Sequence, residues 1–352
     1  MGFIFAILIF SFLIFIHEFG HFITAKLSGV QVNEFSMFMG PALWKKQKGE
    51  TLYSIRCIPI GGYCAMEGED QDSSNPRSFG NAAWWKRIII LVAGAALNFI
   101  AALVLVAIVY APAKAYVEPV ISDFEAFATV DDYGLQVGDR LVEIDGSKVL
   151  MMNDVDLLLM KNPGDYHDLV VERNGQLISL DNFYLERHEV LQENGDTVML
   201  CGFSYGVAKE FTFVSKLQYI WNTAMYWIRA TFLGLEMLFT GQAGLMDMSG
   251  PVGIVQQMGE VADASETMGV AIMNLLYFGA FLGVNLAVMN LLPVPALDGG
   301  RVAALLLTTG IEAVTRKKLN PKYEGYIHGA GMILLLALMA IIMFKDIIFI
   351  FK

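Results

Sequence analysis

The sequence predicts a polytopic α-helical membrane protein, with about four transmembrane helices and one inserted α/β domain outside the cytoplasm. Of the 352 residues, 55% are hydrophobic and 17% are charged, and the mean hydropathy is +0.52. Soluble domains contain about 45–50% apolar and about 25% charged residues, so this composition excludes an ordinary soluble, disordered or collagen-like protein. The net charge of −11 argues against nucleic acid as a partner, because phosphate binding requires clustered lysine and arginine.

Four apolar runs are each long enough to cross a bilayer, which takes about 20 helical residues. They are predicted to form transmembrane helices within residues 1–27, 87–113, 269–300 and 329–351. The first run has no basic segment before it and contains His17, Glu18 and His21. It is therefore predicted to be a retained helix and not a cleaved signal peptide.

The segments between these runs differ in pattern. Within residues 28–86, alternation over residues 51–60 predicts a strand, and Ile60-Gly61-Gly62-Tyr63 predicts a turn or bulge. Residues 115–190 predict a small α/β domain with frequent glycine turns.

Residues 191–268 predict amphipathic helices and a loop. Lys216, Arg229 and Glu236 interrupt an apolar stretch that would otherwise make a fifth span, which favours an interfacial or docked helix.

The distribution of charge predicts the topology. Residues 28–86 and 301–328 are basic for their length, whereas the long middle segment is acidic. By the positive-inside rule, the two basic segments lie in the cytoplasm, and the middle domain and both termini lie outside. The basic residues are Lys26, Lys45, Lys46, Lys48, Arg56, Arg77, Lys86, Arg87, Arg301, Arg316, Lys317, Lys318 and Lys322; the acidic ones include Asp123, Glu125, Asp131, Asp132, Asp139, Glu143 and Asp145.

The first predicted span contains an HExxH motif, His17-Glu18-Phe19-Gly20-His21. On a helix, residues four apart share a face, so the two imidazoles can bind one Zn²⁺ while Glu18 polarises a metal-bound water. A pair of surface histidines is the simpler alternative, but ionisable groups within a membrane span are costly and usually functional. If the helix begins at Phe3, His17 lies about 21 Å along it, below the membrane surface.

A catalytic zinc site needs a third protein ligand and an open position for water. Asp298 is the favoured candidate, because it follows the helix-breaking Pro293 and Pro295 in an apolar segment where an unpaired carboxylate is expensive. A helix cap is the alternative role for Asp298, and His328, at a predicted membrane boundary, is the rival ligand.

Two asparagines of the third span, Asn285 and Asn290, are candidate substrate-binding residues. Asn290 lies near the proline break, where it can hold a substrate backbone or an oxyanion. Hydrogen bonding between packed helices is the alternative role for both side chains.

Together, His17–His21 and the segment from Asn290 to Gly300 (NLLPVPALDGG) resemble the motifs of the site-2 protease family of intramembrane zinc metalloproteases. The similarity is greatest to the bacterial regulator of sigma-E protease (RseP/RasP-like) group. Ile60–Tyr63 resembles the membrane-associated β-loop of this family. The segment from Gly134 to Gly146 resembles the core of a PDZ domain, so residues 115–190 are identified as a PDZ-like domain.

The resemblance implies one Zn²⁺ per chain, bound by His17, His21 and Asp298, with Glu18 as catalytic base. It also implies that Asn290 helps to hold the substrate backbone, and that the β-loop around Gly61, Gly62 and Tyr63 pairs with an unwound substrate strand. The implied substrates are single-span membrane proteins already trimmed outside the membrane, such as anti-sigma factors or signal-peptide remnants. The implied location is the inner (plasma) membrane of a bacterium.

Three other readings compete with this one. A membrane metalloprotease with a glutamate ligand on a later helix is disfavoured by Asp298. A non-catalytic PDZ-containing membrane scaffold with a vestigial zinc site is disfavoured by the intact Glu18. A metal transporter would need several intramembrane ligands along a path, and the sequence offers one compact set.

Overall fold

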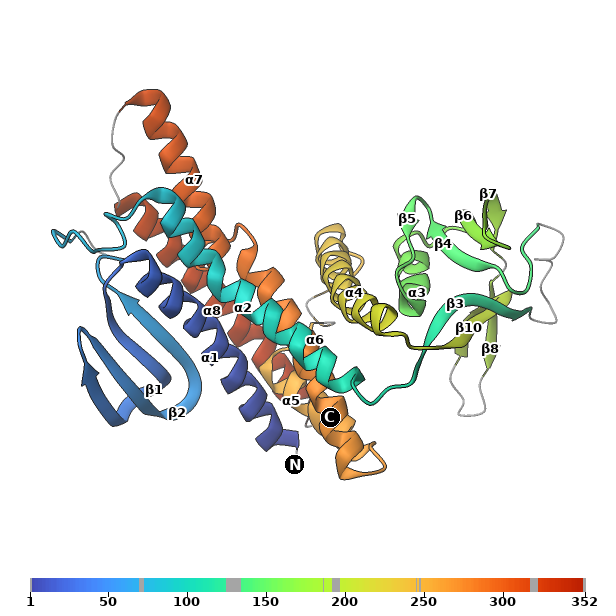
Figure 1. Cartoon of the computed structure of the whole chain (residues 1–352), viewed down its shortest axis with the longest axis horizontal. Helices are drawn as coiled ribbons and strands as arrows, with labels where there is room; N and C mark the ends of the chain where they lie inside the picture. The colour runs from blue at the N-terminus through green and yellow to red at the C-terminus, as the bar shows by residue number, and fades with distance from the viewer. Residues whose placement is uncertain are drawn as a thin grey trace. The chain divides into compact units, whose positions relative to one another are not determined.

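The computed structural model describes residues 2–69, 73–124, 134–185, 187–191, 197–244, 246, 248–316 and 322–350. It divides into two compact units, one of Met1–Val109 with Gly234–Lys352 and one of Tyr110–Leu233 (Figure 1). Among the residues used for the topology prediction, Glu125, Asp131, Asp132, Lys317 and Lys318 lie outside the described residues.

Four helices of the first unit are long and apolar enough to cross a membrane, which confirms the expected number of spans in the described part of the chain. They are α1 (Gly2–Ser28), α2 (Trp84–Tyr110), α6 (Met268–Leu291) and α8 (Lys322–Ile350).

The bounds of three elements differ from the sequence prediction. Helix α8 begins at Lys322, seven residues before the predicted range of 329–351. Helix α2 begins and ends three residues before the predicted range of 87–113. Within residues 269–300, α6 stops at Leu291, because the prolines that follow cannot continue a helical ladder. A new helix, α7 (Asp298–Thr315), then occupies much of the segment from 301 to 328, where a helix was expected only if Asp298 capped it; the N-cap is instead Leu297.

A fifth helix of this unit, α5 (Pro251–Asp263), joins α1 and α6 in an apolar cluster that contains Leu13, Met258 and Leu275. Its first turn is held by α8, because Asp346 Oδ2 accepts a hydrogen bond of 2.8 Å from the backbone N–H of Gly253. Lys345 Nζ lies 3.1 Å from Asp346 Oδ1. The charged pair in the otherwise apolar α8 is therefore used within the protein and does not face lipid.

Strands β1 (Val32–Lys48) and β2 (Thr51–Met66) form a sheet beside α1 (Figure 1). Both strands bend, so that four segments lie in the order 44–48, 51–55, 34–37 and 62–66; Phe35, for example, has Tyr53 on one side and Cys64 on the other. The strand predicted for residues 51–60 thus continues to Met66. The strand does not end at Ile60–Tyr63. The pairing register of β2 against β1 shifts between Met37 and Met39, so the additional residues of β2 form a bulge.

Aromatic packing fixes this sheet on α1. The Phe22 and Phe35 ring centroids lie 4.8 Å apart, and Phe15 lies 5.9 Å from Phe35. Phe22 also packs edge-on against Tyr53 at 5.9 Å. Because Phe15 and Phe22 share the face of α1 that also carries Phe19, this face binds the sheet, and the HExxH imidazoles are left to point elsewhere.

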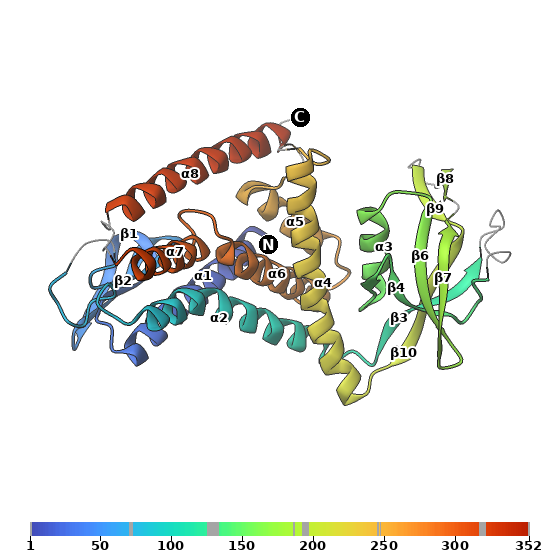
Figure 2. The same cartoon turned by 90° about the horizontal axis from the view of Figure 1, so that it is seen from above.

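The second unit contains a sheet of strands in the order β10-β3-β4-β6-β7, with β5 paired to β4 and α3 on one face (Figure 2). A separate pair is formed by β8 and β9. The elements are β3 (Ala115–Phe124), β4 (Arg140–Ile144), β5 (Ser147–Lys148), α3 (Met152–Lys161), β6 (Tyr166–Arg173), β7 (Gln176–Tyr184), β8 (Arg187–Leu191), β9 (Thr197–Cys201) and β10 (Phe203–Glu210).

Helix α4 (Phe213–Thr240) is not among the helices apolar enough to span a membrane. Within the second unit, Asn222 donates to the carbonyl oxygen of Leu150 at 2.9 Å, and Arg229 pairs with Asp154 at 2.9 Å. These contacts tie α4 to the start of α3.

Replacing Phe35 by alanine tests the attachment of the sheet to α1. The side chain is 9% exposed and contacts three aromatic rings of α1. We expect Phe35→Ala to lower the free energy of unfolding by about 3–5 kcal/mol. Thermal unfolding in detergent measures this loss. Leu43→Ala on the same strand is the control, since Leu43 is 74% exposed; equal destabilisation by both variants would contradict the role given to Phe35.

Candidate metal centre

Three side chains from α1 and α7 converge on one point. His17 Nε2 lies 3.1 Å from His21 Nε2, and Asp298 Oδ2 lies 3.2 Å and 3.3 Å from these two nitrogens. They are the described residues that form a group able to hold a metal ion. Asp298 is far from His17 and His21 in the sequence, so only the folded chain brings the three side chains together.

The spacing of the three atoms fits zinc. Ligands that bind Zn²⁺ at about 2.0–2.1 Å in a tetrahedron are about 3.3–3.4 Å from one another. The observed triangle has edges of 3.1–3.3 Å. In addition, Asp298 Oδ2 is buried and has no hydrogen-bond partner within the described residues. Two neutral imidazoles and one carboxylate are a typical donor set for a catalytic zinc, and the fourth position is left for water.

Contacts behind the imidazoles set their orientation. His21 Nδ1 lies 2.8 Å from the carbonyl oxygen of Ile90 on α2. This acceptor places the proton on Nδ1 and leaves Nε2 free to bind a metal. On the other ring, His17 Nδ1 lies 3.4 Å from Asn290 Nδ2. Because an amide carries both a donor and an acceptor, Asn290 can serve His17 in the same way.

Two glycines allow α1 and α2 to approach closely at this point. A Cβ atom on Gly20 would lie 2.4 Å from the carbonyl oxygen of Ala93, and one on Gly94 would lie 2.4 Å from His21 Nε2. Gly94 therefore leaves open the space beside the ligand atoms. Neither Gly94 nor the Ile90 carbonyl was identified from the sequence.

The turn before α7 brings Asp298 to the histidines. Gly299 and Gly300 pack against the backbone of residues 291–295, where Cβ atoms would lie 2.3 Å from Leu291 O and 2.1 Å from Val294 O. His328 Nδ1 accepts a hydrogen bond of 3.1 Å from the backbone N–H of Ala296. His328 is thus near the turn, but it is not in the described ligand group.

Glu18 lies between the metal ligands and the sheet. It interacts electrostatically with His17, His21 and Asp298 and receives a hydrogen bond from the backbone of Cys64. A Cβ on Gly62 would lie 3.5 Å from Glu18 Cγ. The edge of the sheet formed by residues 62–66 therefore runs past the HExxH glutamate.

The other candidate residues make local contacts within their own elements or with neighbouring strands. Asn285 Nδ2 donates to the carbonyl oxygen of Phe281 in its own helix, at 3.0 Å. Gly61 has φ +81° and packs on Met39. The Tyr63 hydroxyl accepts a hydrogen bond of 2.5 Å from Arg56. Substrate contact by these residues stays a prediction.

A family model described as peptidase family M50 matches residues 5–338. The chain belongs to peptidase family M50.

Full-length relatives support this membership. A Clostridium perfringens protein, provisionally named a zinc metalloprotease, is 35% identical over 350 residues, which cover 99% of each chain. The zinc metalloprotease RasP of Geobacillus kaustophilus is 28% identical over 97% of this chain and 96% of its own. The regulator of sigma-W protease RasP of Bacillus subtilis is 27% identical over 97% of each chain. This member of the M50 family is a multi-pass membrane zinc metalloprotease.

A methyl group on Gly94 is expected to prevent metal binding. In Gly94→Ala the Cβ would occupy the space 2.4 Å from His21 Nε2, where α2 cannot retreat without separating from Gly20. We expect the zinc content of the purified protein, measured by atomic emission, to fall far below one ion per chain.

Gly259→Ala in α5 is the matched control, because nothing lies within 4 Å of the added Cβ. It should keep its zinc. Normal zinc content in Gly94→Ala would show that α2 does not limit the space of the centre.

Proposed function

We propose that this enzyme hydrolyses peptide bonds within the membrane-spanning segments of its substrates, with His17, His21 and Asp298 as the zinc ligands. The observation that carries the proposal is the triangle of 3.1–3.3 Å that Asp298 forms with two histidines of a helix long and apolar enough to span a membrane. His17 is 13 residues beyond Ile4, where the apolar span begins. At 1.5 Å per residue this is about 20 Å, which puts the centre below the membrane surface.

Glu18 performs the proton transfers of the reaction. When bound, zinc polarises the scissile carbonyl and lowers the pKa of its water. Glu18 accepts the proton of the attacking water and delivers it to the nitrogen of the leaving amine. Its position next to all three ligands supports this role, and the Cys64 backbone fixes its carboxylate.

The edge of β2 at residues 62–66 is the proposed docking site for an unwound substrate. A helical substrate hides its peptide bonds in internal hydrogen bonds, so hydrolysis requires local unwinding and a new partner for the freed groups. Strand addition to an exposed sheet edge supplies that partner. Gly62 and Cys64 lie directly beside Glu18, and this proximity brings an added strand to the catalytic base.

The proposed substrates are single-span proteins trimmed beforehand outside the membrane, including anti-sigma factors and signal-peptide remnants. The name of the Bacillus subtilis relative, regulator of sigma-W protease, supports the first class. The sheet and α3 of the second unit support a PDZ-like domain, and its acidic composition supports a position outside the cytoplasm. In that position it would exclude substrates with large external domains from the inner-membrane enzyme.

Two substitutions separate catalysis from metal binding. Glu18→Gln removes the base but none of the proposed ligands, so cleavage of a reconstituted single-span substrate should fall by at least about 100-fold while zinc is retained. Asp298→Asn weakens the ligand set, so both zinc content and cleavage should fall. Mass spectrometry of the wild-type products should place the cut within the span. A fully active Glu18→Gln enzyme would exclude the proposed mechanism.

Filling the gap between the sheet edge and Glu18 tests the docking site. A Cβ on Gly62 would lie 3.1 Å from Ser36 O and 3.5 Å from Glu18 Cγ. The larger side chain of Gly62→Val should crowd the path of an added strand and lower kcat/KM at least about tenfold with zinc unchanged. The matched control is Gly310→Ala, where nothing lies within 4 Å; unchanged kcat/KM in Gly62→Val would refute docking at this edge.

A further inference from the structure

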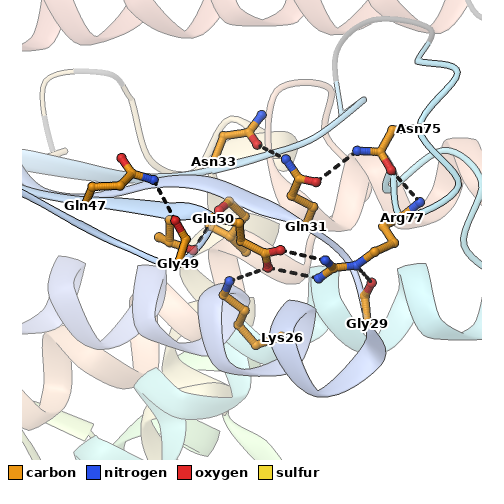
Figure 3. Close-up of polar contacts among 11 residues, drawn as sticks. Lys26, Gly29, Gln31, Asn33, Gln47, Gly49, Glu50, Asn75 and Arg77 are labelled. Atoms are coloured by element: carbon orange, nitrogen blue, oxygen red, sulfur yellow. Dashed lines mark hydrogen bonds and ion pairs between the residues drawn. The ribbon is translucent and has the colours of Figure 1, made fainter.

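The depth of the β1–β2 sheet beside α1 follows from contacts at its two ends. At the Gly49–Glu50 turn, Glu50 pairs with Lys26 and with Arg77, each at 2.6 Å, as Figure 3 shows. At the opposite end, Ser11 Oγ lies 3.5 Å from the carbonyl oxygen of Pro59. Ser11 and Lys26 are about 22 Å apart along α1, so the sheet runs beside the span over most of its length.

The turn lies at the level where α1 leaves the membrane. Lys26 is in the last turn of α1, and Lys86 Nζ donates to the carbonyl oxygen of Ser28 at 3.0 Å. Trp84 and Trp85 at the start of α2 are 53% and 49% exposed at this same end. Tryptophans in such positions mark the boundary between hydrocarbon and headgroups.

Large apolar side chains cover the part of the sheet that lies deeper than the turn. All of these hydrophobic side chains are exposed in the protein. They are Met39, Leu43, Trp44, Ile55 and Ile58. A soluble protein rarely exposes so dense a group. Beside a membrane span, these side chains are positioned for acyl chains.

Lysines follow directly after this apolar set. Lys45, Lys46 and Lys48 are exposed, and none of them pairs with a carboxylate within the described residues. The acid of the turn, Glu50, is already shared by Arg77 and Lys26, whose hydrogen bonds lower its pKa to about 2. Glu34 pairs with Arg56 at 2.7 Å. The three lysine charges are therefore available to an external anion.

We propose that residues 43–48 bind anionic phospholipid in the leaflet at the C-terminal end of α1. Leu43 and Trp44 contact the acyl chains, while the ammonium groups of Lys45, Lys46 and Lys48 reach the phosphate and headgroup layer. Each lysine beside an anionic surface strengthens binding about fivefold. The surface requires only insertion of the protein in a bilayer and does not depend on the proposed proteolysis.

Quenching of tryptophan fluorescence by brominated lipid tests the proposal. The full-length protein is reconstituted in phosphatidylcholine bilayers that contain equal small fractions of brominated phosphatidylglycerol or brominated phosphatidylcholine. We expect the wild type to bind the anionic lipid about tenfold or more in preference to the neutral one. The preference should decrease as salt screens the charges.

Two triple variants decide the outcome. Lys45→Gln/Lys46→Gln/Lys48→Gln should lose the preference to within about twofold of unity, since it lacks all three charges. Lys114→Gln/Lys148→Gln/Lys161→Gln removes the same charge from exposed lysines of the second unit and should keep it. Zinc content reports that each variant is folded.

The proposal is overturned if the wild type shows no anionic preference, or if the first triple variant keeps it. If the wild type shows no anionic preference, the lysines would instead bind an acidic protein segment. The experiment measures lipid binding, so a negative result would not bear on the proposed proteolysis. Conversely, Glu18→Gln should leave lipid binding unchanged.

Discussion

The close approach of α1 and α2 at Gly20 and Gly94 is the constraint on which the metal centre depends. With both positions lacking a Cβ, the Ile90 carbonyl comes within 2.8 Å of His21 Nδ1 and orients the ring. The same approach leaves the volume beside Nε2 empty. A side chain at either position would separate the helices or fill that volume, so the histidine spacing on α1 is necessary but insufficient for a site.

Polar groups at membrane depth must find partners within the protein, and most of them do. Asp346 is satisfied by Gly253 at the start of α5, and the Ala296 N–H is satisfied by His328. Asp298 Oδ2 is buried as well, and it lies 3.2 Å from His17 Nε2 and 3.3 Å from His21 Nε2. Burying a carboxylate costs several kcal/mol in such surroundings unless a cation compensates its charge. A metal ion held by these three atoms would supply that compensation.

The sequence predicted the parts of the site that are local. The spacing of His17 and His21 implies a shared helical face, and the prolines before Asp298 imply a turn that can place a carboxylate. Gly94 and the Ile90 carbonyl could not be predicted, since their roles arise only when α2 packs on α1. For Ile60–Tyr63 the sequence left a turn or a bulge open, and pairing with β1 decides for a bulge and carries the strand to Met66. A helix after Asp298 was expected only in the alternative in which Asp298 caps it, because the predicted third span was taken to reach residue 300.

The β1–β2 sheet connects Glu18 with the segment proposed to bind lipid. One edge, residues 62–66, lies beside Glu18, and the other, residues 44–48, carries the three free lysines. Two segments separate these edges, so they lie about 14 Å apart at the usual strand spacing. The aromatic contacts of Phe35 and Tyr53 hold the middle of the sheet on α1. A sheet fixed at its centre cannot shift at one edge without tilting at the other, so anchoring of the lysines in the headgroup layer would set the angle at which the opposite edge faces Glu18.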